Sequence, residues 1–99
     1  MNIQSMMAQA QKMQRDIAKK KEEIDKKIFP GKYQVVDVEV NGKKEIISIR
    51  ISQDNFETAD DVEMLADMIK LAINDAFGKV DAEIEEKMGG YGQALNGLF

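Results

Sequence analysis

The amino-acid sequence predicts an α+β domain in which a long helix, a short antiparallel sheet of two to three strands and a second long helix follow one another. Two stretches, residues 3–28 and 62–88, repeat apolar residues at helical spacing. Between them, two alternating apolar runs flank Asn41-Gly42, a dipeptide typical of tight hairpin turns. The length of 99 residues suits one domain, spanning residues 1–99.

The first helical stretch carries an apolar seam with steps of three, four and seven residues. The seam consists of Ile3, Met6, Ala10, Met13, Ile17, Ile24 and Ile28, interrupted where Lys20 or Lys21 takes an apolar position. At 1.5 Å per residue the helix is about 37 Å long, more than one small domain covers. Its free end therefore projects into solvent or packs on a second chain, and the Met-rich part of the seam favours the second chain.

A basic stripe lies opposite this seam on the helical wheel. It consists of Lys12, Arg15, Lys19 and Lys26 and is roughly 21 Å long. Glu22 and Glu23 lie within one turn of these bases, so the same residues also fit a solvated face with ordinary intrahelical ion pairs. The stripe by itself is more typical of that second interpretation.

The hairpin should define the sheet. A two-residue loop at Asn41-Gly42 pairs Val36 with Ile47 and Glu39 with Lys44. One face then carries the apolar residues Val36, Val38, Val40, Ile47, Ile49 and Ile51, which the helices must cover because a hairpin alone is marginally stable. Ile28-Phe29, stopped by Pro30-Gly31, predicts a brief extended segment beside the hairpin.

The second helix is predicted from Val62 to Met88, with an unbroken apolar stripe wide enough to cover the sheet. Two capping boxes are available at its start, Thr58 with Asp61 and Asp60 with Glu63, and the second has the more usual acidic partner. Gly89-Gly90 predicts the end of the helix, and residues 89–99 form a flexible glycine-rich tail in this prediction.

The composition argues against catalysis. The chain has no histidine and no cysteine, so the common general base, the thiol nucleophile and the usual transition-metal ligands are absent. Asp60, Asp61 and Glu63 could hold a divalent cation, but they also suit a helix N-terminus. We expect no catalytic residue, cofactor, metal or small-molecule substrate. We also expect no membrane span, and the cytoplasm as the compartment.

The net charge of −4 is unevenly distributed along the chain. Residues 1–52 hold eleven Lys or Arg and seven Asp or Glu, whereas residues 53–99 hold three and eleven. The first half thus carries +4 and the second half −8. Such a distribution steers a polyanion toward one part of the surface.

Several segments together resemble the YbaB/EbfC family of bacterial nucleoid-associated proteins. They are Met7-Ala8-Gln9-Ala10-Gln11-Lys12-Met13-Gln14, Val38 to Gly42, Glu63-Met64-Leu65 and Ala72-Ile73-Asn74-Asp75-Ala76. The resemblance implies an α-β-β-β-α protomer that forms a tweezer-like homodimer through its sheet region, with helices as the arms. It also implies a cytoplasmic protein of the nucleoid.

The resemblance further implies binding of double-stranded DNA by basic residues of the arms. Carried over to this chain, these residues are Lys12 within the matching motif and, after it on the same helix, Arg15, Lys19, Lys20, Lys21, Lys26 and Lys27. Contacts to phosphates would give little base readout. The alternative is a dimeric scaffold or adaptor whose Met-rich seam binds a protein partner.

Overall fold

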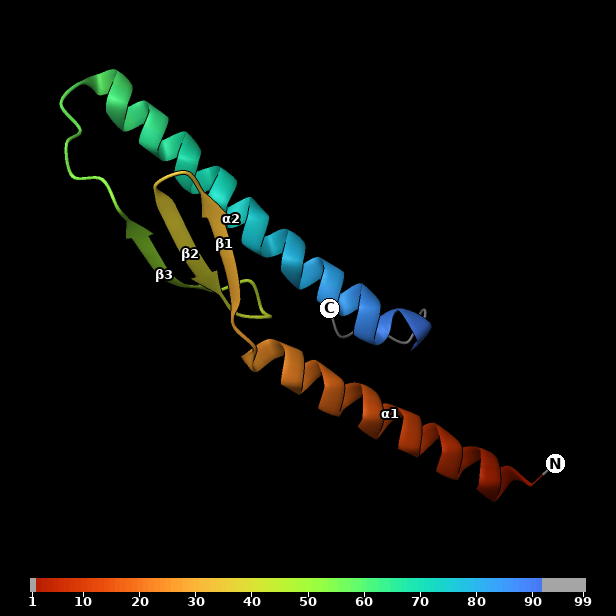
Figure 1. Ribbon diagram of the computed structural model, residues 1–99. Helices are drawn as coiled ribbons and strands as arrows, with labels where there is room; N and C mark the ends of the chain where they lie inside the picture. The colour runs from red at the N-terminus through yellow and green to blue at the C-terminus, as the bar shows by residue number, and fades with distance from the viewer. Residues whose placement is uncertain (1, 92–99) are drawn as a thin grey trace.

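The computed structural model describes residues 2–91. Its elements are helix α1 (Ile3–Lys26), strands β1 (Phe29–Tyr33), β2 (Val36–Val40) and β3 (Ile46–Ile51), and helix α2 (Ala59–Met88). This α-β-β-β-α order confirms the predicted fold class. The molecule is a rod of 71 × 18 × 17 Å, because the two helices run past one another only in part (Figure 1).

The sheet has the order β1-β2-β3, and both pairs of neighbours are antiparallel. The extended segment predicted beside the hairpin is therefore confirmed as β1, which pairs with β2 from Phe29 opposite Val40 to Tyr33 opposite Val36. Gly31 brings β1 against α2, since a Cβ there would lie 2.3 Å from the carbonyl oxygen of Ala72. Only glycine permits this approach.

The predicted two-residue turn between β2 and β3 is wrong. The backbone N–H of Asn41 donates to the carbonyl of Glu45, and the N–H of Lys44 donates to the carbonyl of Asn41, both at 3.0 Å. Residues 42–44 thus form a three-residue loop. Its left-handed position is taken by Lys44, with φ of 61°. This is a type I turn followed by a left-handed residue, the usual three-residue hairpin connection.

Side-chain bonds and helix packing explain why Asn41 and Gly42 occur here. The Asn41 Oδ1 accepts from the backbone N–H of Lys43 at 2.9 Å and from that of Glu45 at 3.0 Å, which stabilises the turn. Position 42 must be glycine because the loop packs closely on α1. A Cβ there would lie 1.9 Å from the carbonyl oxygen of Ile24. The dipeptide thus holds the loop against α1.

The longer loop changes the strand register. Val36 lies opposite Ile51 instead of Ile47, and Glu39 lies opposite Ser48 instead of Lys44. The Ser48 hydroxyl donates to Glu39 Oε1 at 2.8 Å, so a hydrogen bond replaces the predicted ion pair. A register shift follows between Glu39 and Val40.

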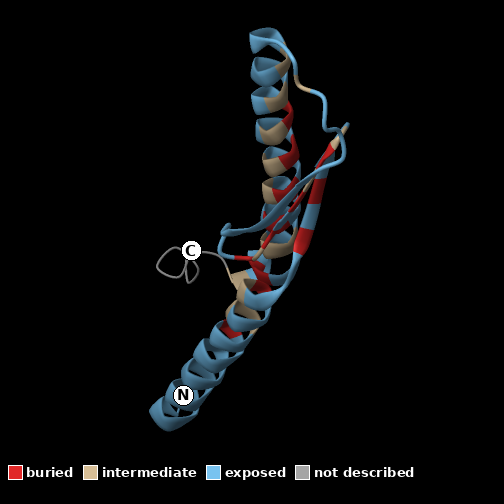
Figure 2. Cartoon of the chain, turned by 90° about the vertical axis from the view of Figure 1, so that its left-hand side faces the viewer, coloured by how far each residue is buried: buried red, intermediate tan, exposed pale blue. Residues whose placement is uncertain are grey.

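The core lies between α2 and strands β1 and β2. Val36, Val38 and Val40 are buried, and α2 packs on the sheet with residues that include Ala72, Ala76 and Val80 (Figure 2). All six residues of β3, in contrast, are exposed. The prediction that the helices cover the whole Val/Ile face is therefore right for β2 and wrong for β3.

Both helices begin at side-chain caps. Asn2 accepts from the backbone N–H of Gln4 before α1, and Thr58 forms a reciprocal capping box with Asp61 before α2. The capping box made by Thr58 is thus the one that forms, and it starts α2 three residues before Val62. The predicted flexible tail extends from residue 89, and its residues 92–99 lie outside the described part of the chain.

Candidate nucleic-acid interface

The N-terminal half of α1 projects beyond the body of the molecule. Ile17 and Ile24 are buried, whereas every residue from Asn2 to Asp16 is exposed. This half of the helix extends away from the sheet (Figure 1). We call residues 2–16 the arm. The length of the helix was predicted from the seam, with its free end either projecting into solvent or packing on a second chain. α1 ends at Lys26, two residues before Ile28.

Three basic residues of α1 are open to solvent. Lys12, Arg15 and Lys19 are exposed, and none has a hydrogen-bond or ion-pair partner for its side chain within residues 2–91. Their spacing of three and four residues puts them on one face over about 10 Å of helix. We call these residues the open triad. An unpaired cationic face of this kind can accept a polyanion without breaking any internal contact.

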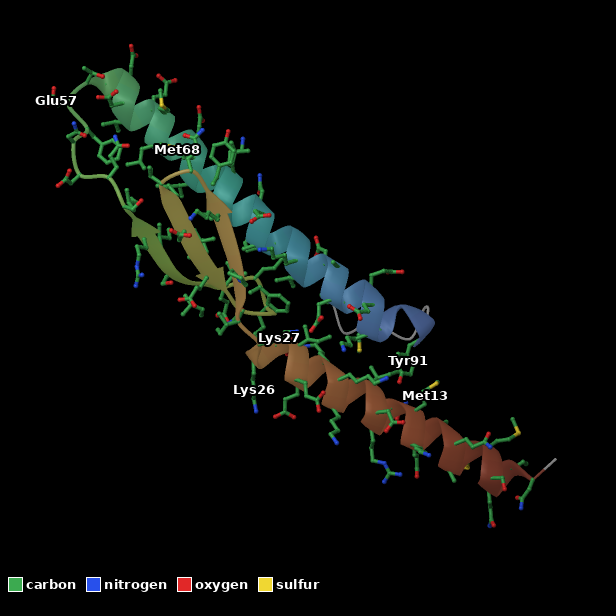
Figure 3. The ribbon with its side chains drawn as sticks, in the orientation of Figure 1. Met13, Lys26, Lys27, Glu57, Met68 and Tyr91 are labelled. Atoms are coloured by element: carbon green, nitrogen blue, oxygen red, sulfur yellow. The ribbon has the colours of Figure 1, made fainter. Side chains whose placement is uncertain are left out.

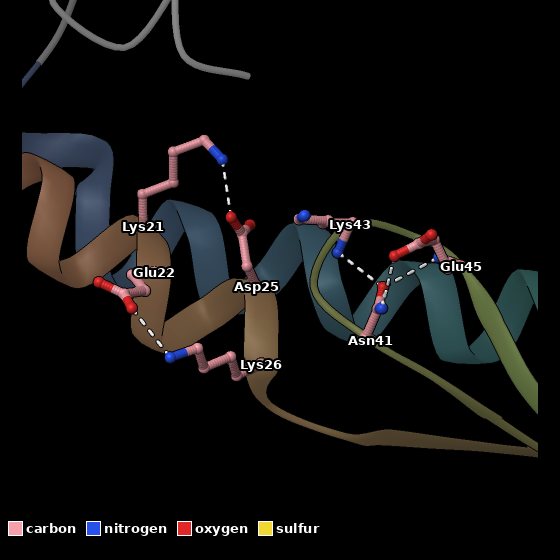
Figure 4. Close-up of polar contacts among 7 residues, drawn as sticks. All are labelled: Lys21, Glu22, Asp25, Lys26, Asn41, Lys43 and Glu45. Carbon is pink, nitrogen blue, oxygen red and sulfur yellow. Dashed lines mark hydrogen bonds and ion pairs between the residues drawn. The ribbon is translucent and has the colours of Figure 1, made fainter.

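The fourth stripe residue, Lys26, is exposed but paired. Its ammonium lies 2.8 Å from Glu22 Oε1 (Figure 4). The hydrogen bond from Lys26 lowers the pKa of Glu22, and the same bond raises the pKa of Lys26. Exposed pairs of this kind stabilise little and exchange readily with solvent ions, so Lys26 stays accessible to an external anion.

The remaining three predicted residues, Lys20, Lys21 and Lys27, flank the buried part of the seam. Lys20 donates to the Tyr91 hydroxyl at 2.9 Å, and its ammonium lies 4.9 Å from the centre of that ring. This hydrogen bond raises the pKa of Lys20. Lys21 pairs with Asp25 at 2.7 Å. Their position beside the seam explains why these lysines have partners.

Lys27 is engaged by two elements. Its ammonium pairs with Glu83 of α2 and lies 5.5 Å from the centre of the Phe29 ring. The structure thus divides the seven predicted site residues into the open triad and four lysines with partners. Lys21 and Lys26 pair within α1, whereas Lys20 and Lys27 contact Tyr91 and Glu83. The sequence analysis grouped all seven because the partners Glu83 and Tyr91 are distant in sequence.

The acidic charge gathers at the other end of the rod. The segment between Arg50 and Lys70 contains no basic residue, and Glu57 in it lies far from the arm (Figure 3). Its six acidic residues are Asp54, Glu57, Asp60, Asp61, Glu63 and Asp67. Six of the eleven acidic residues in 53–99 therefore belong to this segment, whereas Asp81 and Glu83 of α2 pair with Lys44 and Lys27.

One basic residue near the stripe was missed by the sequence analysis. Lys43, in the loop held against α1 by Gly42, lines a groove of about 420 Å³ together with Lys26 and Asn41 (Figure 4). Glu22, Asp25 and Glu45 line the same groove, so its balance of charge is not basic. No sequence signal places Lys43 there, because its position depends on the contact between the loop and α1.

The acidic residues at the start of α2 serve its N-terminal cap. Within residues 2–91 no polar or charged side chain is buried, and no group of three acidic side chains is placed to hold a metal ion. The Asp61 carboxylate, a candidate cation ligand, instead accepts from the backbone N–H groups of Glu57 and Thr58. In the same part of the chain, neither helix has an apolar stretch that could cross a membrane.

The structure is an α-β-β-β-α rod whose first helix projects from the body and carries an exposed cationic face. Comparison with known proteins identifies the family. Residues 1–95 match the model of the YbaB/EbfC DNA-binding family, and the chain belongs to this family.

Its relatives include proteins named nucleoid-associated protein in several bacteria. The one from Ligilactobacillus salivarius is 37% identical over 100 residues, covering 99% of this chain and 95% of the relative. The one from Clostridium novyi is 43% identical over 103 residues, covering 100% of this chain and 90% of the relative. The one from Streptococcus thermophilus is 38% identical over 97 residues, covering 96% of this chain and 97% of the relative.

Proposed function

We propose that this chain is a non-enzymatic DNA-binding protein of the bacterial nucleoid and contacts the phosphates of double-stranded DNA through the open triad. The carrying observation is that Lys12, Arg15 and Lys19 share one exposed face and have no internal partner within residues 2–91. Family membership and the names of the relatives support DNA as the polyanion. Phosphate contacts position a protein on DNA without selecting a sequence.

The other predicted site residues take a secondary role in this proposal. Lys26 joins the triad by exchanging Glu22 for a phosphate, which is a small change at an exposed site. Lys20, Lys21 and Lys27 contact DNA only by giving up internal contacts such as those with Tyr91, Asp25 and Glu83. We therefore rank the triad first.

The proposal includes a homodimer formed through the sheet region. β3 is an edge strand, and its isoleucines Ile46, Ile47, Ile49 and Ile51 are between 38% and 55% exposed. A contiguous apolar edge of this kind is unusual on a monomer and marks an interface. A second copy that covers β3 would place two arms in one particle, which suits a grip on a duplex.

The exposed Met-rich part of the arm supports the alternative, a dimeric scaffold or adaptor for a protein partner. Ile3 is 72% exposed, and Met6 and Met13 are about half exposed. Salt separates the two functions, because phosphate contacts release counterions whereas apolar burial does not.

The experiment is a gel-shift titration of the purified protein with two unrelated duplexes, each at a low and a high salt concentration. We expect similar affinity for both duplexes and a steep loss of affinity at high salt. The absence of a shift at low salt would contradict the proposal. Duplex affinity that does not change with salt would contradict the phosphate contacts.

A further inference from the structure

The arm has an apolar face that nothing within residues 2–91 covers. Its members share one line along α1 and are all exposed: Ile3, Met6, Ala10 and Met13. We call these four residues the arm seam. On the same line nearer the body, Ile17 and Ile24 are each only 3% exposed. The arm seam therefore continues a surface that already packs against other elements.

The spacing of this line is that of a coiled-coil seam. From Ile3 to Ile24 the steps alternate strictly between three and four residues, and Lys20 is the one position on the line that is not apolar. Such a narrow stripe suits contact with a single helix, whereas packing on a sheet or a globular core takes a wider apolar face. The arm seam thus fits one partner helix with the same spacing.

The arm of a second copy is such a helix, and two arms complement one another when they run antiparallel. In that arrangement each seam residue meets the alternate seam position of the other helix. The pairing puts Ile3 of one arm opposite Met13 of the other, and Met6 opposite Ala10. Both arms use the same four residues, so the contact closes about a two-fold axis.

The place of α2 favours the antiparallel direction over the parallel one. α2 contacts α1, and its Met88 belongs to the same core cluster as Ile17 and Ile24. In a parallel pair, the two α2 helices would compete for the same space beside the seam. In an antiparallel pair the two bodies lie at opposite ends, because the sheet and α2 lie at the far end of α1 from its N-terminus (Figure 1).

The charges of the arm permit this contact. The positions that flank the arm seam carry no lysine or arginine, and they are Asn2, Met7, Gln9, Gln14 and Asp16. Two arms therefore meet without repulsion between basic side chains. The open triad lies on the other side of the helix and faces away from the partner.

We propose that the arm seam pairs with the arm seam of a second copy as a short antiparallel coiled coil. Four seam residues from each arm make a small contact at the weak end of protein interfaces, so we expect pairing above the micromolar range. The paired arms present two open triads on opposite sides. This interface is separate from β3 and forms without DNA.

Site-specific cross-linking tests the pairing, because the chain has no cysteine and one introduced thiol is unique. Gln9→Cys places the thiol beside the seam and near the two-fold axis, where a short bismaleimide can join two chains. Ala8→Cys is the matched control, since it places the thiol on the outer side of the helix at the same level. Met13→Cys reports direction, because an antiparallel pair separates the two thiols by about 15 Å along the helix and a parallel pair brings them together.

We expect Gln9→Cys to give a linked dimer whose yield rises with protein concentration, also in an Ile49→Asp background, while Ala8→Cys and Met13→Cys give little. Adding Met6→Asp to Gln9→Cys should lower the yield at least about tenfold, because it puts a charge into the seam of both arms. Circular dichroism should show an unchanged fold for each variant.

Three results would overturn the proposal. They are equal linkage at Gln9 and Ala8, linkage at Gln9 that is unaffected by Met6→Asp, and linkage at Met13 that exceeds linkage at Gln9. Linkage that disappears with Ile49→Asp would also contradict an interface separate from β3. The assay contains no DNA, so its failure leaves the proposed DNA binding untouched.

Discussion

Replacing Gly42 with alanine tests how the hairpin loop is held on α1. The new Cβ would lie 1.9 Å from the carbonyl oxygen and 2.4 Å from the carbonyl carbon of Ile24. Ordinary contacts begin near 3.5 Å, and both obstacles are backbone, so no rotamer change relieves the clash. Overpacking of this kind costs about 1–3 kcal/mol. Because the loop must move by more than 1 Å, we expect a loss near the upper end, about 2–3 kcal/mol.

The assay is urea unfolding followed by circular dichroism at one fixed protein concentration, since oligomerisation makes stability depend on concentration. Gly78→Ala is the matched control. A Cβ at Gly78, inside α2, meets no atom within 4 Å, so alanine there should stabilise by about 1 kcal/mol through helix propensity. If Gly42→Ala were as stable as the unchanged protein, the loop would not be packed on α1 as described.

Three further predictions concern the remaining elements. Thr58→Ala removes the capping box of α2 and should lower the free energy of unfolding by about 1 kcal/mol, measured by urea unfolding. Asn41→Gly removes the acceptor for two backbone N–H groups and should destabilise by about 1–2 kcal/mol, whereas a turn that needed only positive φ would tolerate it. Ile49→Asp puts a charge on the exposed face of β3 and should yield monomers in sedimentation at micromolar concentration, while a dimer that persists would exclude β3 from the interface.

Local sequence signals predicted the elements well. The helical periods gave α1 and α2 to within three residues at each end, because an apolar stripe must follow the surface that buries it. Pro30-Gly31 did not prevent a strand, since β1 is an edge strand and Gly31 meets the backbone of Ala72. The burial of the β2 valines also followed from alternation alone.

The errors arose where distant parts of the chain meet. Asn41-Gly42 looked like a tight turn, but Gly42 serves the approach of α1, and Lys44 adopts the left-handed conformation while its ammonium pairs with Asp81 of α2 at 2.8 Å. Neither contact is visible in the local sequence. The predicted register of β3 was therefore also wrong, because it assumed a two-residue loop.

The sequence predicted which basic residues lie on α1, but not which of them have partners elsewhere in the chain. The helical wheel correctly placed Lys12, Arg15 and Lys19 on a solvent face, because their spacing is a property of α1 alone. The partners of Lys20 and Lys27 lie more than fifty residues away in sequence, at Tyr91 and Glu83. Only the fold shows that these two lysines are already engaged.

The most direct test of the account is the salt dependence of DNA binding after removal of two triad charges. In a Lys12→Ala, Arg15→Ala double variant, the slope of log affinity against log salt should be shallower by about 1.8, since each phosphate contact contributes about 0.9. Affinity should fall about equally on unrelated duplexes. Circular dichroism should show an unchanged fold, because both side chains are exposed and unpaired within residues 2–91.

The matched control removes the same charge from exposed positions of α2, by Lys70→Ala with Lys87→Ala. It should keep the slope of the unchanged protein. The account predicts a shallower slope for the arm variant only. An arm variant that folds and binds DNA with the affinity and salt slope of the unchanged protein would contradict it, and would make the open triad an ordinary solvated helix face.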